Sequence, residues 1–218
     1  MKGSRPPKYR TDPGLEGEFE PGSRGKVLRN KLGIRTIPEM DQAEYNALEE
    51  AQERYLDIVT EKTVFTAAFI RNMHRDWLGG IYAWAGTYRT VEMSKGGFTW
   101  PPASRVADNM DRFEANLLQP KTPFRKSSPR DAAEDLAIIH AELLLIHPFR
   151  EGNGRLARWL AELMCLQAGI NRPDYGFDIP GSKAVHVRYL EAVTKGYEQD
   201  YRALADFFLE ALERSTAG

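Results

Sequence analysis

The sequence has little of several features that are typical of secreted, membrane-spanning or nucleic-acid-coating proteins. Its one cysteine, Cys165, cannot form an internal disulfide, and the apolar helical pattern around it indicates a buried thiol. Unbroken apolar runs such as 143–146 are far too short to cross a bilayer, and the polar, proline-containing start is unlike a signal peptide. The formal net charge of -1 gives no general basic field. We therefore expect a cytoplasmic protein with no membrane contact and no direct nucleic-acid contact; a chain exported by a dedicated secretion system would have the same features.

The composition changes near residue 30. Residues 1–30 contain several prolines and glycines and few apolar side chains, which is typical of an extended or loosely docked N-terminal arm. A chain of 218 residues is near the upper end of what one domain holds. We therefore expect residues 31–218 to form one folded domain.

Apolar side chains recur at helical spacing through most of that domain. The pattern predicts helices near residues 41–58, 66–78, 104–117, 129–146, 153–169, 182–197 and 201–212. The first is expected to begin at a capping box, Asp41 to Glu44, and to bury Tyr45, Leu48, Tyr55 and Ile58. The helix over 129–146 is apolar on most sides towards its end, which favours a place in the middle of a bundle.

One segment departs from the helical pattern. Residues 87–100 contain several side chains that favour strands, placed around a Lys95-Gly96-Gly97 turn, and this combination predicts a short hairpin. The expected fold class is therefore all-α, a helical bundle with one small β-hairpin.

A short loop between two of the expected helices carries an unusual concentration of reactive groups. His147 can accept a proton from a hydroxyl near neutral pH, and the Glu151 carboxylate suits a Mg²⁺ ion that bridges phosphates. The segment Gly152–Gly154 allows successive N–H groups to point into one concavity at a helix start, where phosphate is favoured. Arg155 and Arg158 are three residues apart, so both guanidinium groups project from one side of the first turn. Together these groups indicate chemistry at a phosphorus atom.

These residues also have ordinary structural interpretations. Alone, His147 could be a helix C-cap, and the two arginines could be solvated charges; the surrounding loop argues against both. His140 stands one heptad before His147, but without an accompanying metal motif it is expected to pack structurally. His74 and His186 have no partners in the sequence and are expected to be surface or structural residues.

Residues 147–158, His-Pro-Phe-Arg-Glu-Gly-Asn-Gly-Arg-Leu-Ala-Arg, resemble the signature of the Fic family, HPFx(D/E)GNGRxxR, and match it at every fixed position. A weaker similarity covers roughly residues 25–213 and includes Gly33-Ile34, the segment Ala83–Arg89 and the expected hairpin. The resemblance implies a Fic-type helical bundle of the AMP-transferring type. It also implies transfer of AMP from ATP to a Ser, Thr or Tyr hydroxyl of a target protein, with pyrophosphate as the leaving group.

The same resemblance implies a role for each matching residue. His147 would be the base, Phe149 would anchor the loop, and Glu151 would bind Mg²⁺. Gly152, Asn153 and Gly154 would bind the phosphates and stabilise the charge that develops on the α-phosphate. Arg155 and Arg158 would hold the β- and γ-phosphates. The hairpin resembles the flap with which the family aligns its target, and its position makes Lys95 and Phe98 candidates for that contact. Tyr197 and Tyr201 resemble residues near the adenine pocket by position, although a core role is the stronger expectation.

Other functions and the mode of regulation stay open at this point. Another nucleotide could be transferred; transfer of phosphate is disfavoured because the relatives that catalyse it have lysine in place of Gly154. A nucleotide-binding regulator without turnover is a further alternative, against which the intact His147 argues. Many relatives are inhibited by a motif (S/T)xxxE(G/N) whose glutamate pairs with the second arginine, here Arg158. Because Thr194–Gln199 matches it imperfectly around Glu198, we prefer inhibition by a separate antitoxin chain, with this protein as the toxin of the pair.

Overall fold

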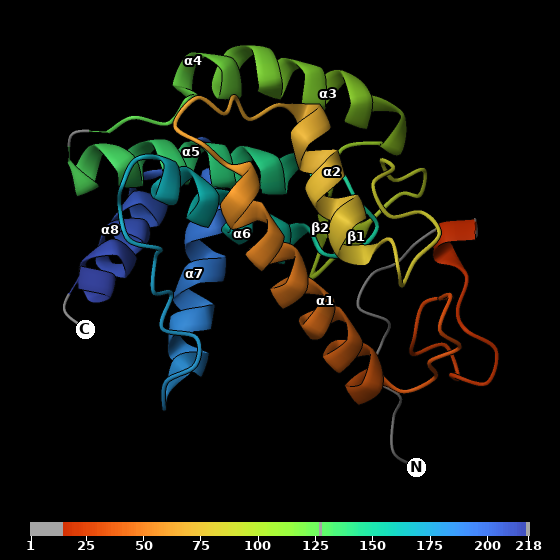
Figure 1. The fold of residues 1–218 in the computed structure, drawn as a ribbon. Coiled ribbons are helices and arrows are strands. Elements are labelled where there is room, and N and C mark those ends of the chain that lie inside the picture. Colours follow the sequence, from red (N-terminus) through yellow and green to blue (C-terminus); the bar gives the residue numbers. More distant parts are fainter. Residues whose placement is uncertain (1–14, 127, 217–218) are drawn as a thin grey trace.

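Helix α5 (Pro129–Ile146) is the centre of the bundle in the computed structural model, which describes residues 15–126 and 128–216 (Figure 1). Its first turn is capped by Ser128, whose hydroxyl accepts from the Asp131 N–H at 3.1 Å, and Pro129 follows directly. Side chains are buried on most of its faces, and it packs against α6 (Asn153–Gln167), α7 (Ser182–Gly196), α8 (Arg202–Thr216) and α3 (Val106–Phe113). Within the described residues, no helix combines the length and apolar character that crossing a bilayer requires.

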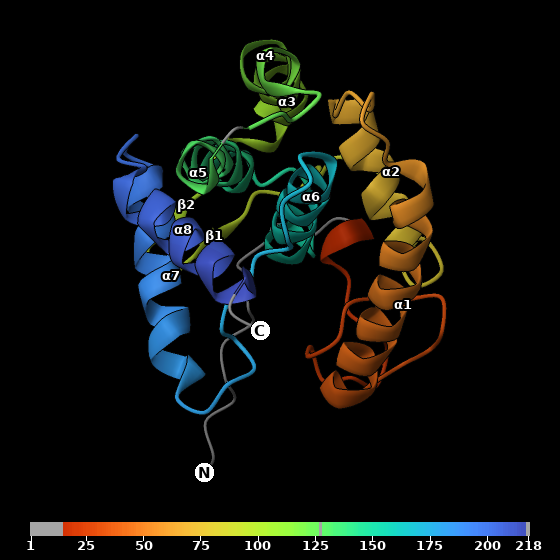
Figure 2. The same cartoon turned by 60° about the vertical axis from the view of Figure 1, so that its left-hand side comes forward.

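Helices α1 (Ile37–Ile58) and α2 (Ala67–Leu78) form a pair on the other side of α6. Figure 2 shows α6 between this pair and the group of α5, α7 and α8, and contacts of α6 with α1, α2 and α5 agree with that view. Helix α2 begins at Thr66, whose hydroxyl accepts from the Phe69 N–H at 3.0 Å, and ends before Gly79, as expected. The α1–α2 pair and the group of α5, α7 and α8 therefore lie on opposite sides of α6.

The predicted start of the first helix is wrong. Helix α1 begins after Thr36, with Pro38 in its first turn, so Asp41 and Glu44 lie inside the helix and do not cap it. Pro38 is tolerated there because the first helical N–H groups have no partner within the helix. Thr36 instead donates to Glu39 at 2.6 Å.

The buried face of α1 also differs in part from the prediction. Tyr55 is buried and Leu48 is partly buried, but Tyr45 and Ile58 are 54% and 50% exposed. The buried side chains are Met40, Glu44, Ala51 and Tyr55. The helix is thus rotated so that a carboxylate, Glu44, faces the interior.

A nearly continuous helical segment runs over α5 (Figure 1). It consists of η2 (Ala103–Arg105), α3, the π-helical turn η3 (Glu114–Leu118) and α4 (Gln119–Lys121). Before it, β1 (Ser94–Lys95) and β2 (Phe98–Thr99) form the predicted hairpin, with Ser94 opposite Thr99 and Lys95 opposite Phe98. Helix α7 starts at Ser182, where the sequence predicts it, with Gly181 as its N-cap, and α8 continues four residues beyond the predicted end at 212.

Residues 15–30 are packed on the domain rather than loosely attached. They contain the short 3-10 helix η1 (Leu15–Gly17) and an antiparallel bridge between Phe19 and Leu28, and Val27 joins the core with 3% exposure. The rest of the predicted arm, residues 1–14, lies outside the described residues. The predicted domain boundary near residue 30 stays a prediction.

Candidate active site

The end of α5 places His147 at the start of the loop that the sequence singles out. His147 is the C-cap, in the left-handed conformation with φ 52° and ψ 60°, and its N–H donates to the Leu143 carbonyl at 3.0 Å. Its imidazole is buried, with Nδ1 3.3 Å from the Leu144 carbonyl. Because a carbonyl can only accept, this contact puts the proton on Nδ1 and leaves the lone pair on Nε2. That tautomer suits Nε2 as a general base.

Asn153 holds the loop in its shape. Its side-chain amide donates to the Phe149 carbonyl at 2.7 Å and accepts from the Phe149 N–H at 2.9 Å. Phe149 is fully buried and its ring stacks on the imidazole of His74. The Asn153 side chain is thus engaged by the protein itself, so any phosphate contact of this residue falls to its backbone N–H.

The start of α6 provides the expected concave row of N–H groups. Gly152 is its N-cap with φ 86°, a conformation in which a Cβ would lie 2.9 Å from Cζ3 of Trp77. The first backbone hydrogen bond of the helix runs from the Leu156 N–H to the Gly152 carbonyl at 2.9 Å. The N–H groups of residues 153–155 therefore have no partner within the helix, and the positive end of its dipole favours an anion there.

Arg155 lies at this helix start and is held by a carboxylate from α1. Its Nη2 is 2.5 Å from Oε2 of Glu44 and 3.7 Å from Oε1 of Glu151, and its guanidinium lies over the ring of Trp77 at 4.7 Å. Oε1 of Glu44 accepts from the Tyr82 hydroxyl at 2.6 Å. The buried Glu44 therefore determines where the Arg155 guanidinium lies.

Arg158 projects from the next position on the same side of α6. Its guanidinium lies 5.4 Å from the ring of Phe177 and 5.9 Å from that of Tyr189, and a Cβ on Gly154 would be 3.7 Å from its Nη1. The Tyr189 hydroxyl is 2.8 Å from Nε2 of His140, whose pKa is lowered by burial to about 3. His140 is thus a buried, neutral packing residue, as expected.

Glu198 does not contact Arg158. Both residues are described, and no ion pair connects them. Glu198 is exposed beyond the C-terminal end of α7, whereas the Arg158 guanidinium packs against the rings of Phe177 and Tyr189. The imperfect inhibitory motif therefore makes no inhibitory contact in this conformation.

The residues present fit a magnesium ion that arrives with a polyphosphate. The Glu151 side chain is 13% exposed and its Oε1 accepts from the Gly152 N–H at 3.2 Å. Among the residues that the structure describes, no group of three or more His, Cys, Asp or Glu side chains could hold a metal by itself. Mg²⁺ usually takes only one or two carboxylates and completes its shell with water and substrate phosphates. A single carboxylate beside a phosphate-binding helix start is consistent with this coordination.

The hairpin lies next to His147. The ring of Trp100, which follows β2, is 4.1 Å from the imidazole of His147, and its Nε1 donates to the Leu144 carbonyl at 3.0 Å. The Phe98 ring packs on the rings of Trp100 and Tyr197, with centroids 5.4 Å and 4.9 Å apart. Lys95 is exposed on the opposite strand. The structure thus brings the predicted flap and the predicted base together.

The Fic/DOC family matches residues 64–165 of this chain, a range that contains α2, the hairpin, α5 and the whole loop. Together with the complete signature at residues 147–158, this match places residues 64–165 in the Fic/DOC family. It is 28% identical over 184 residues to a protein of Sinorhizobium fredii named "Probable protein adenylyltransferase y4lH", covering 82% of this chain and 88% of that protein. It is 29% identical over 150 residues to the Escherichia coli protein named "Probable protein adenylyltransferase Fic", covering 66% of this chain and 70% of that protein.

A solved structure has the same fold. The crystal structure of the BepC protein of Bartonella tribocorum superposes with a TM-score of 0.70, at 21% identity, over 84% of this chain and 91% of that chain. The predicted resemblance to the Fic family and the predicted all-α fold with a small hairpin are therefore both confirmed.

Three residues around the Fic loop were not singled out from the sequence. His74 was given no partner, yet it is fully buried against the loop, so the surface alternative is excluded. Glu44 was assigned to a helix cap, yet it binds Arg155. Arg89 belongs to the segment that resembles the family, and the structure shows that it donates to the His147 carbonyl at 2.8 Å. No local pattern marks any of the three, because each partner is distant in the sequence.

The remaining expected residues lie as follows. His186 is exposed and stacks on Phe177 with ring centroids 3.9 Å apart. Tyr197 and Tyr201 both pack partly buried against the core, and the Tyr201 hydroxyl donates to Glu142 at 2.6 Å. A core role for both tyrosines agrees with these contacts, whereas a contact with adenine stays a prediction.

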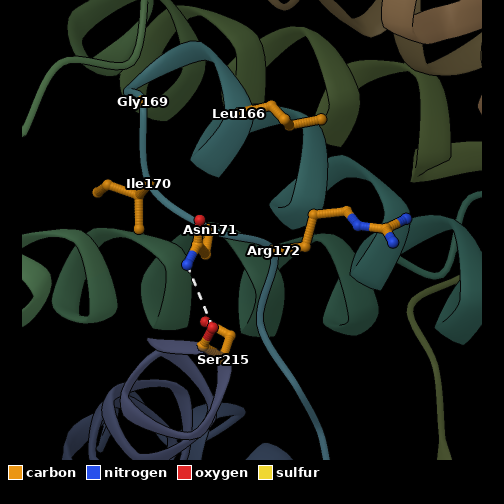
Figure 3. A pocket seen from close by; sticks show the side chains of 6 residues that line it. All are labelled: Leu166, Gly169, Ile170, Asn171, Arg172 and Ser215. Carbon is orange, nitrogen blue, oxygen red and sulfur yellow. Dashed lines mark hydrogen bonds between the residues drawn. The ribbon is translucent and has the colours of Figure 1, made fainter. Parts of the chain in front are cut away.

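A hollow of about 540 Å³ lies away from the Fic loop, at the C-terminal end of α6 (Figure 3). It is lined by Leu166, Gly169, Ile170, Asn171, Arg172 and Ser215. Asn171 donates across it to the Ser215 carbonyl at 3.1 Å. The lining offers no general base and no carboxylate, so it is not the candidate site.

Proposed function

We propose that this Fic protein transfers AMP from ATP to a Ser, Thr or Tyr hydroxyl of another protein. The observation that carries the proposal is the joint placement of His147 and the start of α6 by one short loop: a base with its lone pair on Nε2, beside a row of N–H groups suited to phosphates. The names of the Sinorhizobium and Escherichia relatives support adenylyl transfer, and the Bartonella structure holds AMPPNP, an analogue of ATP.

The chemistry would proceed by direct displacement. Nε2 of His147 removes the proton from the target hydroxyl as its oxygen attacks the α-phosphorus of ATP. The bond from the α-phosphorus to the bridging oxygen breaks, and pyrophosphate leaves. The N–H groups at the start of α6 stabilise the charge on the α-phosphate, and Arg155 and Arg158 hold the β- and γ-phosphates.

The loop would bind Mg²⁺ through Glu151. A bound magnesium ion supplies positive charge that stabilises the developing negative charge on the phosphates. The Gly152 N–H and the nearby Arg155 guanidinium orient the Glu151 carboxylate for that role.

The test is transfer of radioactive label from ATP to proteins of a cell lysate in the presence of Mg²⁺. Label from α-³²P-ATP but not from γ-³²P-ATP is expected on protein, because AMP carries only the α-phosphate. The His147→Ala variant should bind ATP as the wild type does and transfer no label, since the α6 helix start is untouched. Parallel reactions with α-labelled GTP, CTP and UTP determine the base that is transferred.

Each other outcome would support a different function. Label from the γ-position would indicate phosphate transfer, and preference for another nucleotide would change the transferred group. No label from any nucleotide, with measurable ATP binding and no inhibitory chain present, would favour a nucleotide-binding regulator and overturn the proposal.

We also propose that activity is inhibited by a separate antitoxin chain, with this protein as the toxin. The missing contact between Glu198 and Arg158 supports this proposal, because the imperfect internal motif does not engage the clamp. Expression in a growing culture tests it. Growth should stop with the wild type and continue with His147→Ala, whereas unaffected growth with active enzyme would contradict the toxin role.

A further inference from the structure

Arg89 is buried, with 2% exposure, and its guanidinium connects three separate segments of the chain. Nε donates to the His147 carbonyl at 2.8 Å, Nη1 to the Val91 carbonyl at 2.9 Å and Nη2 to the Pro101 carbonyl at 2.6 Å. Nη2 also lies 3.5 Å from the Ile146 carbonyl. One side chain thus links the end of α5 to both sides of the hairpin.

The chemistry of these contacts requires an arginine. The carbonyls of residues 146 and 147 lie at the end of α5, where they have no partner within the helix and carry partial negative charge that attracts a cation. The guanidinium has five N–H donors in a fixed planar fork, so it can donate to carbonyls in three directions at once. A lysine would keep the charge but concentrate its donors at one atom.

The hairpin needs such an anchor because it is too short to be stable alone. Each strand has two residues, and isolated two-stranded hairpins are marginal in water. Val91 stands three residues before β1 and Pro101 two residues after β2, so Arg89 binds the hairpin at both of its ends. Trp100 adds a second link through its contacts with the Leu144 carbonyl and the His147 ring.

We infer that Arg89 is a positioning residue that fixes the hairpin relative to His147, so that alignment of the target and removal of its proton are coupled. This inference rests on the proposed function, in which the hairpin aligns the target. A base must come within hydrogen-bonding reach of the proton that it removes. A displaced hairpin would hold the target hydroxyl out of reach of Nε2 while the phosphate-binding start of α6 stays intact.

The experiment compares wild type, Arg89→Lys and a control, Arg112→Lys, which changes an exposed arginine on α3. Three quantities are measured for each: label transfer from α-³²P-ATP to lysate proteins, the Kd of ATP, and the melting temperature. For Arg89→Lys we expect transfer to fall by about tenfold or more, because small misplacements of reacting groups slow reactions strongly. The Kd of ATP should stay as in the wild type, and Arg112→Lys should change none of the three.

A double variant tests whether Arg89 acts through the hairpin. Phe98→Ala removes a hairpin side chain that packs on the rings of Trp100 and Tyr197. If Arg89 acts by placing the hairpin, Arg89→Lys and Phe98→Ala should be non-additive: the double variant transfers about as little label as the poorer single variant. If the fold-losses of label transfer in the two single variants multiply in the double variant, the inference is overturned.

Further outcomes separate this inference from the proposed function. Absence of transfer in the wild type would refute the proposed function itself. Full transfer by Arg89→Lys, or a parallel loss of transfer, ATP binding and melting temperature, would refute the positioning role. If Arg89→Lys does not fold, Trp100→Phe replaces it, since it removes the indole N–H link to α5 and keeps a ring beside His147. That variant must lower transfer without weakening ATP binding; equal transfer would contradict the coupling.

Discussion

The imidazole of His74 lies flat against the ring of Phe149, with centroids 3.9 Å apart and planes inclined by 7°. Nδ1 accepts from the Gly86 N–H at 2.8 Å, and Nε2 therefore carries the proton that is donated to the Glu151 carbonyl at 3.1 Å. A second proton on Nδ1 would point at the Gly86 N–H. His74 thus holds both Phe149 and Glu151 in place only while it is neutral.

We predict that acid destabilises the protein through His74. Burial lowers the pKa of His74 from 6.5 to about 4, so between these values the unfolded chain binds a proton that the folded protein does not. The free energy of unfolding therefore falls as the pH drops from about 6.5. Below about pH 4 the contribution of His74 to this loss is complete. The full loss is about 3 kcal/mol, from roughly 1.4 kcal/mol for each pH unit.

The matched variant for this prediction is His74→Gln, which cannot titrate in that range. Urea unfolding at several pH values should show a shallower acid loss in the variant than in the wild type. Two other groups are common to both proteins and cancel in the comparison: His140, with a pKa lowered by burial to about 3, and Glu162, with a pKa raised by burial to about 6. Identical pH profiles in the two proteins would contradict the assignment to His74.

Glu44→Gln should weaken ATP binding and stability together. The change removes the carboxylate that holds Arg155 but keeps an acceptor for the Tyr82 hydroxyl, so the unfolding free energy should fall by about 2 kcal/mol. Glu50→Gln, an exposed change on the same helix, is the control. Calorimetric titration with ATP measures the Kd, and tighter binding by Glu44→Gln would mean that Glu44 competes with phosphate instead of orienting Arg155.

The two glycines of the loop should respond differently to alanine. At Gly152 a Cβ would meet Trp77 at 2.9 Å with φ at 86°, so Gly152→Ala should cost ~3 kcal/mol of stability. At Gly154 a Cβ has only an ordinary contact, 3.7 Å from Arg158, so Gly154→Ala should fold normally and lose label transfer because its methyl group crowds the phosphate site. Thermal unfolding and the transfer assay check both. Full activity of Gly154→Ala would contradict its proposed place beside the phosphates.

Glu198→Gly should leave automodification unchanged. Glu198 is exposed and forms no ion pair with Arg158, whose guanidinium packs against the rings of Phe177 and Tyr189. Labelling of the purified protein by α-³²P-ATP, with and without the substitution, measures the effect. A large rise would show that the segment Thr194–Gln199 is an internal inhibitor after all.

Local patterns predicted most elements because each depends on neighbours along the chain. The helices near 66–78 and 129–146 and the Gly96-Gly97 turn occur as expected, because the caps at Thr66 and Ser128 and the turn itself are satisfied within a few residues. The start of α1 was misplaced because two segments fit a capping pattern, one at Thr36 and one at Asp41. Spacing alone does not distinguish them, since Pro38 is as compatible with a first turn as with a preceding loop.

The sequence by itself determined the family, the helical bundle and the loop from His147 to Arg158, because these groups lie within one turn and one helix start. Only the tertiary structure decided what surrounds that loop. Glu44 reaches Arg155 from 111 residues away, His74 reaches Glu151 across 77, and Arg89 reaches His147 across 58. Helical spacing relates residues three or four apart and carries no information about such partners. Glu44 and His74 meet the loop because the apolar faces of α1 and α2 are buried against α6, and Arg89 meets it because the segment before the hairpin packs on the end of α5.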